Sequence, residues 1–241
     1  MPETLVLLHG FGGTHRAWDG VIERVDRERY RPLALDLPGH GSAAAVSRPI
    51  TFASCVDAVL AEAPGRFALC GYSLGGRVAL HVALAAPERL ARLVLVGANP
   101  GIEDAAERAA RLAADERLAQ RLEAEPFEDW IESWRAQPLF AEEPAAAGAL
   151  ARADHRRNDP LALAAAMRGL SVGRMAPLWA RLGELTMPVD LVAGERDSTY
   201  VALAQRAARL LPHGSVTVLA GGGHSLPLED PDGVAAVLDR R

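Results

Sequence analysis

Short apolar runs alternate with longer amphipathic stretches along most of the chain. The apolar runs cover residues 4–8, 32–36, 67–70, 93–96, 189–193 and 215–219. Runs of this length indicate strands that are buried on both faces, as a parallel sheet requires. The stretches between them, such as 76–86 and 200–211, have the spacing of apolar positions that is typical of helices. The alternation predicts an α/β fold with a mostly parallel, doubly wound sheet that binds ligands at the carboxyl ends of its strands.

One long region interrupts this alternation. Between residues 99 and 185 no good strand appears, and prolines separate Ala-rich helical segments. We interpret residues 99–185 as an all-helical cap inserted above the sheet. Residues 1–98 and 186–241 are then the α/β core.

Composition excludes several classes of function. The 241 residues carry 26 basic and 31 acidic side chains, a formal charge of −5, which argues against a nucleic-acid surface. All 26 basic residues are Arg, so a Schiff-base lysine is excluded. No apolar run is long enough for a membrane span, and the chain starts without the regions of a signal peptide, so we expect a cytoplasmic protein. Cys55 and Cys70 are expected to be reduced core thiols.

The strongest chemical signal is the sequence Gly-Tyr-Ser-Leu-Gly at residues 71–75. It lies between a predicted strand and a predicted helix, the context in which G-x-S-x-G presents a nucleophilic serine on a tight turn. The serine is Ser73, and the N-terminus of the following helix directs partial positive charge at it. We therefore predict that Ser73 is a catalytic residue.

Two partners for this serine are expected later in the chain, first an acid and then a histidine. Asp197 follows the predicted strand at 189–193, and His224 follows the last predicted strand. Asp197 also suits the N-cap of the next helix, a role compatible with catalysis. Glu195 is the rival acid.

A glycine-rich loop after the first strand, His-Gly-Phe-Gly-Gly at residues 9–13, predicts an oxyanion hole. The backbone N–H groups of Phe11 and Leu74 would point at a developing oxyanion. The loop at residues 36–41 lies at the same edge of the predicted sheet, and we expect it to be structural. The sequence has neither the histidine and cysteine spacing of a metal site nor a nucleotide-binding glycine loop, so no metal and no cofactor are predicted.

Taken in order, these motifs resemble the α/β-hydrolase superfamily. Further segments resemble the 2-succinyl-6-hydroxy-2,4-cyclohexadiene-1-carboxylate (SHCHC) synthases of menaquinone biosynthesis. These segments are residues 71–77, 98–101, 134–141, 157–160 and 194–198. The resemblance spans nearly the whole chain, including the helical insertion.

This resemblance implies a lyase that needs no cofactor and acts on a small substrate with three carboxylates. Ser73, activated by His224 and oriented by Asp197, would remove a proton α to a ketone, and the enolpyruvyl group would leave as pyruvate. A serine carboxylesterase or thioesterase with the same triad is the alternative. A noncatalytic binding protein on the same fold is a third hypothesis, which an intact triad disfavours.

Arginine is suited to a polyanionic substrate because its planar guanidinium binds carboxylates in a bidentate manner. Arg77 lies one helical turn beyond the serine, and the resemblance implies that Arg111 also binds substrate. The third family arginine aligns with His155 or with its neighbour Arg156. The predicted substrate-binding residues are thus Arg77, Arg111, Trp134, Tyr72 and Arg156, with His155 as the alternative to Arg156.

Overall fold

A single six-stranded sheet forms the centre of the protein. The computed structural model describes residues 2–45 and 49–240, so the predicted core assignment of residues 1, 46–48 and 241 lies outside the described residues. The strands are β1 (Glu3–Leu8), β2 (Tyr30–Leu35), β3 (Phe67–Tyr72), β4 (Leu90–Val96), β5 (Val189–Gly194) and β6 (Gly214–Leu219). Their order is β2-β1-β3-β4-β5-β6, and every neighbouring pair is parallel. All six predicted strands are present, and the parallel doubly wound sheet is confirmed.

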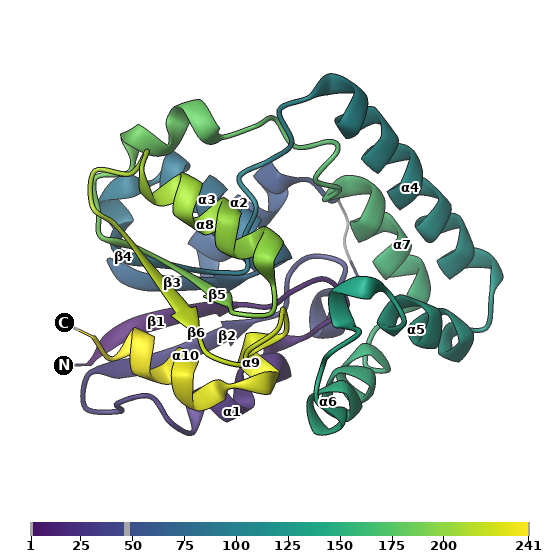
Figure 1. Cartoon of the computed structure of the whole chain (residues 1–241), viewed down its shortest axis with the longest axis horizontal. Coiled ribbons are helices and arrows are strands. Elements are labelled where there is room, and N and C mark those ends of the chain that lie inside the picture. Colours follow the sequence, from purple (N-terminus) through teal and green to yellow (C-terminus); the bar gives the residue numbers. More distant parts are fainter. Residues whose placement is uncertain (1, 46–48, 241) are drawn as a thin grey trace.

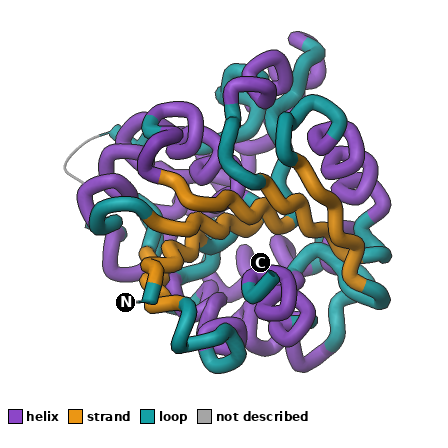
Figure 2. The backbone as a smooth tube through the Cα atoms, turned by 90° about the vertical axis from the view of Figure 1, so that its left-hand side faces the viewer, coloured by secondary structure: helices purple, strands orange, loops and turns teal. Residues whose placement is uncertain are grey.

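Helices cover both faces of the sheet, which appears as a central band in Figure 2. The helices α2 (Phe52–Glu62), α3 (Leu74–Ala85) and α8 (Ser198–Ala208) pack on one face, and α1 (Asp19–Ile22), α9 (Leu226–Glu229) and α10 (Pro231–Leu238) lie on the other (Figure 1). Successive side chains of a strand point to opposite faces. Leu5 and Leu7 of β1 accordingly belong to one core cluster, and Val6 and Leu8 to the other.

The two edge strands correct one expectation. All six strands were expected to be buried on both faces, but most residues of β2 and β6 are partly exposed, and Val218 is 42% exposed. Each of these strands lies at an end of the sheet and pairs with one neighbouring strand. Burial on both faces is therefore a property of the inner strands.

Four helices separate β4 from β5: α4 (Ala105–Ala124), α5 (Phe127–Arg135), α6 (Ala145–His155) and α7 (Pro160–Gly169). Residues 99–185 are all described and contain no strand. Asp104 and Asp159 accept backbone N–H bonds at the starts of α4 and α7, which satisfies donors that a helix leaves unpaired. The helices pack around a separate apolar cluster that includes Trp130 and Leu163. They lie at the side of the sheet opposite the two termini (Figure 1).

Short 3-10 helices complete the structure: η1 (His15–Trp18), η2 (Gly41–Ala43), η3 (Pro87–Arg89), η4 (Pro138–Phe140) and η5 (Trp179–Glu184). Both cysteines are free and buried, as expected. Among the helices of the described chain, none combines the length and the apolar character needed to cross a membrane.

Candidate active site

The turn between β3 and α3 holds Ser73 in a strained backbone conformation. Its φ of 52° and ψ of −108° make it the only non-glycine residue with positive φ among the described residues. The neighbouring backbone passes so close that a Cβ at Gly71 would lie 2.3 Å from the carbonyl oxygen of Gly75. A Cβ at Gly75 would lie 2.1 Å from the carbonyl oxygen of Leu8. Both glycines are therefore required by space, and the turn presents Ser73 at the N-terminus of α3.

Ser73, His224 and Asp197 lie together although they follow three different strands. His224 Nε2 is 3.2 Å from Ser73 Oγ, and His224 Nδ1 is 2.7 Å from Asp197 Oδ2. His224 and Asp197 are buried. With the Asp197 carboxylate accepting a hydrogen bond from Nδ1–H, the free lone pair of Nε2 can accept the serine proton. Asp197 also accepts the N–H of Tyr200 at 3.4 Å, so it caps α8 as well.

The rival acid Glu195 points elsewhere. Its carboxylate accepts the N–H of Gly221 at 2.9 Å, on the exposed side of the loop. It stabilises the glycine-rich segment before His224 and has no hydrogen bond to the imidazole. The geometry therefore favours Asp197 as the acid.

A buried carboxylate fixes the loop that carries the histidine. Glu229 accepts the N–H groups of Gly223 at 2.8 Å and Ser225 at 2.9 Å, the residues on either side of His224. Arg196 donates to the same carboxylate at 2.7 Å. These bonds restrain the backbone on both sides of the imidazole. Neither Glu229 nor Arg196 was expected from sequence motifs.

Two backbone N–H groups near Ser73 are free to bind an oxygen atom. Within the described chain, neither the Phe11 N–H nor the Leu74 N–H has a hydrogen-bond acceptor. The Leu74 N–H belongs to the first turn of α3, where no intrahelical acceptor exists. The loop and the helix are joined directly, because the N–H of Gly75 donates to the carbonyl of His9 at 3.0 Å. This arrangement is suited to an oxyanion hole.

His9 is a structural residue of the loop at residues 9–14, which we call the oxyanion loop after the role proposed for it. Its Nε2 accepts the N–H of Leu37 at 3.0 Å, so its Nδ1–H donates to the carbonyl of Gly10 at 2.8 Å. Burial lowers the pKa of His9, which keeps the imidazole neutral and both hydrogen bonds intact. The loop at residues 36–41 also has a structural role here. His40 from that loop packs against the ring of Phe11, with 5.5 Å between ring centroids.

Ser73 and His224 line a cavity between the sheet edge and the insertion. The cavity is also lined by Phe11, Tyr72, Arg77, Asn99, Ile102, Arg111, Trp134, Arg135, Gln137, Phe140, Asp154, His155 and Tyr200, among others. Four of the five predicted substrate-binding residues, namely Tyr72, Arg77, Arg111 and Trp134, are in this set. The helices between β4 and β5 and the loops that follow the strands therefore contribute to one cavity.

Arg77 differs from the other arginines of the cavity in the partners of its guanidinium. Its Nη1 donates to the carbonyl of Leu170 at 2.9 Å, and it makes no ion pair with a carboxylate of the described residues. Burial lowers the pKa of its guanidinium to about 10, so it remains protonated at neutral pH. Arg111 differs, because its Nε lies 2.8 Å from the buried carboxylate of Asp115. Among the described residues, the guanidinium of Arg77 thus has no acidic partner, whereas that of Arg111 is paired.

Aromatic side chains form another wall of the cavity. Trp134 stacks on Trp130 with ring centroids 5.2 Å apart, and it lies 5.1 Å from the ring of Phe11. Tyr72 packs so tightly against Gly10 that a Cβ there would lie 2.6 Å from its ring. Burial raises the pKa of the Tyr72 phenol, so it stays protonated and can donate a hydrogen bond.

Arg156 does not lie where the sequence placed it. Its guanidinium points outward, pairs with Glu128 at 2.8 Å, and the side chain is 46% exposed. The neighbouring residue, His155, lines the cavity, with its Nδ1 hydrogen-bonded to the carbonyl of Ala151 at 2.6 Å. Position 155 is on the inner side of α6, and the chain turns outward one residue later, at the end of the helix. Of the two alternatives, the structure brings only His155 to the cavity.

Two further cavity residues were missed by the sequence analysis. Tyr200 lies in the first turn of α8, and its ring centroid is 4.5 Å from that of His224. Its position three residues after Asp197 was a usable signal, because residues i and i+3 share a side of a helix. Arg135 is buried, pairs with Glu143, and stacks over Phe140 at 3.7 Å. Nothing in the sequence distinguished Arg135 among the 26 arginines.

No group of three or more His, Cys, Asp or Glu side chains in residues 2–45 and 49–240 is arranged to hold a metal ion.

Comparison with known proteins gives a consistent picture. The Abhydrolase_6 family, described as the alpha/beta hydrolase family, matches residues 5–237. The chain is 36% identical over 240 residues to the SHCHC synthase of Salmonella paratyphi C (strain RKS4594), covering 98% of this chain and 92% of that protein. The SHCHC synthase of Salmonella agona (strain SL483) is 35% identical over the same length. These matches confirm the resemblance seen in the sequence.

Solved structures agree at the level of the fold. A structure of MenH from S. aureus superposes with a TM-score of 0.92 and 30% identity, covering 98% of this chain and 91% of that one. A thermophilic esterase from Thermogutta terrifontis has a TM-score of 0.84 at 22% identity, covering 99% and 88% of the two chains. At that identity the esterase shows a common fold and nothing more about chemistry.

Proposed function

The chain belongs to the α/β-hydrolase family and, within it, to the SHCHC synthases, and from this premise we propose that it is a pyruvate-eliminating carbon–oxygen lyase. Its substrate would be 2-succinyl-5-enolpyruvyl-6-hydroxy-3-cyclohexene-1-carboxylate, and its product SHCHC, as in menaquinone biosynthesis. The single observation that carries the proposal is Arg77, a half-buried guanidinium that lines the cavity of Ser73 and His224 and has no acidic partner among the described residues. An unpaired cation that is partly removed from water is costly, and a substrate carboxylate would satisfy it.

In the proposed reaction, Ser73 acts as a base. His224 Nε2 takes the hydroxyl proton, and Asp197 stabilises the resulting imidazolium, consistent with their separations of 3.2 and 2.7 Å. The serine oxygen removes the proton α to the ketone, and the electron pair of that C–H bond forms an enolate. The enolate oxygen accepts the N–H groups of Phe11 and Leu74. The enolate then collapses, the ring C–O bond breaks, and enolpyruvate leaves, takes the proton held by the His224 imidazolium and tautomerises to pyruvate.

The remaining cavity residues would bind and orient the substrate. Arg77 and Arg111 would bind carboxylates, Tyr72 would donate a hydrogen bond, and Trp134 would pack on the ring. The position of Arg156 gives it no part in this binding. The chemistry moves a proton and breaks one C–O bond without net oxidation, so the proposal requires neither a metal nor a redox cofactor.

We propose that residues 99–185 are a cap over a core formed by residues 1–98 and 186–241. The cavity supports this division, because Ser73 and His224 come from the core, whereas Arg111, Trp134 and His155 come from the inserted helices. The cap would exclude water from the enolate. We place the reaction in the cytoplasm, since a substrate with three carboxylates does not cross a membrane unaided.

The test is incubation of the purified protein with the enolpyruvyl precursor, with pyruvate measured by a coupled assay. We expect stoichiometric release of pyruvate and of SHCHC, and only slow hydrolysis of p-nitrophenyl esters. Added chelator should leave the rate unchanged. Rapid ester hydrolysis with an acyl-enzyme burst and no pyruvate would instead establish the serine esterase or thioesterase alternative.

A further inference from the structure

The junction between α6 and α7 reaches out of the insertion and contacts the oxyanion loop. Asn158 donates from Nδ2 to the carbonyl of Gly12 at 2.8 Å, and its Oδ1 accepts the N–H of Gly41 at 2.9 Å. Asn158 is buried, with 7% of its surface exposed. The side-chain amide of Asn158 therefore links two loops of the core. It donates a hydrogen bond to the loop of Gly12 and accepts one from the loop of Gly41. The segment at residues 157–160 was distinctive in sequence, yet the proposed chemistry gives it no role.

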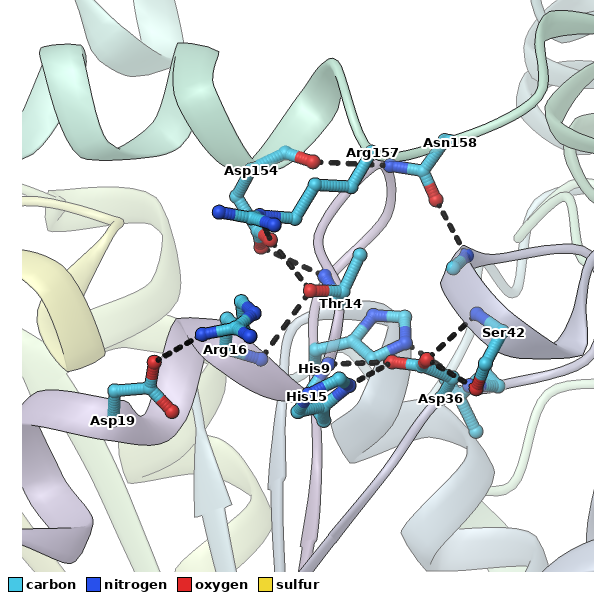
Figure 3. A network of polar contacts seen from close by, with 12 residues as sticks. His9, Thr14, His15, Arg16, Asp19, Asp36, Ser42, Asp154, Arg157 and Asn158 are labelled. Carbon is cyan, nitrogen blue, oxygen red and sulfur yellow. Dashed lines mark hydrogen bonds and ion pairs between the residues drawn. The ribbon is translucent and has the colours of Figure 1, made fainter.

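A second side chain, from the last turn of α6, holds the oxyanion loop at Thr14. The buried carboxylate of Asp154 accepts the N–H of Thr14 at 2.7 Å and the hydroxyl of the same residue. Figure 3 shows Asp154 pointing toward Thr14, whereas the side chain of Asn158 points toward the loop that carries Ser42. Arg157 lies 3.8 Å from Asp154 and partly balances its charge.

The contacts made by Asn158 and Asp154 lie on the C-terminal side of Phe11, and contacts made by the core lie on its N-terminal side. On the N-terminal side, the imidazole of His9 binds the carbonyl of Gly10 at 2.8 Å. On the C-terminal side, Gly12 adopts a φ of +74°, and Asn158 holds its carbonyl. The Phe11 N–H therefore lies between a point fixed by the core and a point fixed by the insertion.

We propose that Asn158, supported by Asp154, is a positioning residue of the oxyanion hole, so that docking of α6 and α7 on the core sets the direction of the Phe11 N–H. Asn158 contacts the loop backbone and takes no part in the lining of the cavity. The inference rests on the proposed function in one respect only, which is that the Phe11 N–H stabilises an oxyanion. That requirement is common to the lyase and to the esterase alternative.

The experiment compares two variants of Asn158 with a control one residue away. Asn158→Leu has a similar volume and removes both bonds to the core loops, together with the bonds that Nδ2 donates to the carbonyls of Asp154 and His155. Asn158→Asp keeps the acceptor for the N–H of Gly41 but places an oxygen against the carbonyl of Gly12. Asp159→Ala removes the N-cap of α7, which accepts the N–H of Ala162 at 2.8 Å, and leaves the oxyanion loop untouched. The control thus weakens the same junction without the proposed contact.

Two readouts are used for each variant: the separate kcat and KM for pyruvate release, and the Kd for a trifluoromethyl ketone. When Ser73 Oγ adds to that ketone, its proton passes to His224 and the carbonyl electron pair moves to the oxygen, which becomes an anion in the hole. Loss of one oxyanion donor costs about 10²–10³-fold in kcat. We expect a misdirected donor to cost about 10–100-fold in kcat and in ketone affinity, with KM changed less than about threefold.

The proposal is supported if both Asn158 variants show this pattern and Asp159→Ala lowers Tm while keeping kcat and ketone affinity. It is overturned if the Asn158 variants lose only Tm, as the control does, or if KM rises at constant kcat. If Asn158→Leu does not fold, Asn158→Asp decides between these outcomes. If the wild type releases no pyruvate but binds the ketone, the proposed function fails while the ketone affinities still test the loop. A wild type that binds no ketone would overturn the inference as well.

Discussion

The edge of the sheet and the inserted helices contribute to the same cavity in different ways. At the sheet edge, Ser73, Asp197 and His224 each follow a strand, and short backbone contacts hold the turns that carry them. In the insertion, Arg111 and His155 project from helices whose placement depends on packing between helices. The difference teaches that the proposed reacting groups are positioned by local backbone geometry, whereas the other residues of the cavity are positioned by tertiary packing.

Replacement of Ser73 should have the largest effect. Two variants should separate the loss of the serine oxygen from the relief of backbone strain. Ser73→Ala and Ser73→Gly should both lower kcat by at least about 10³-fold, because each removes the oxygen that takes the proton. Only the glycine variant relieves the positive φ of 52°, so it should be more stable than the alanine variant by about 1 kcal/mol. Steady-state kinetics and thermal unfolding measure the two effects. Equal Tm values would show that the turn stores no strain, and full activity would rule out the triad.

The next largest effect concerns Arg77 and Arg156, which the sequence analysis had both predicted to bind substrate. Arg77→Ala should lower kcat/KM for the precursor by at least about tenfold, because a buried charged contact contributes about 2–5 kcal/mol when one partner is truncated. Arg77→Lys should recover only part, since an ammonium lacks the planar fork of a guanidinium. Arg156→Ala is the matched control and should change kcat/KM less than twofold, because its guanidinium pairs with Glu128 at the surface. An equal loss in Arg77→Ala and Arg156→Ala would contradict the assignment of the cavity.

The smallest effect is a pH dependence of stability that links the insertion to the core. Burial lowers the pKa of His155 to about 4, whereas a histidine in the unfolded chain titrates near 6.5. Below about pH 6.5 the unfolded chain takes up a proton that the folded protein does not, so stability falls as the pH drops toward 4. His155→Gln should flatten this part of the profile of Tm against pH, and replacement of the exposed His213 should not. A second, separate transition that alone responds to His155→Gln would show that the insertion unfolds independently of the core.

Much of the fold, and the proximity of the proposed reacting groups, could be predicted from local sequence. The apolar runs marked all six strands, and Ser73, Asp197 and His224 each follow one of them. Parallel strands place their carboxyl ends at one edge of the sheet, so residues far apart in the chain meet there without further information. The glycines at 71 and 75 added a steric signal, because no other residue fits the turn.

The surroundings of these groups could not be predicted in the same way. Sequence left His155 and Arg156 as alternatives, and only the end of α6 decided which one faces the cavity. Tyr200 and Arg135 were not identified, and the amide of Asn158 gave no sign of its two partners 117 and 146 residues away. The pattern of apolar residues also did not reveal that β2 and β6 are edge strands.

The sequence by itself therefore determined the strands, the family and the order of the residues that we propose to react. Each of these follows from short segments in which neighbouring residues restrict one another's backbone. The tertiary structure alone decided which side chains of the inserted helices face Ser73 and which contacts hold the oxyanion loop. The physical reason is that a helix presents side chains in every direction, and only its packing against distant parts of the chain selects the ones that reach the site.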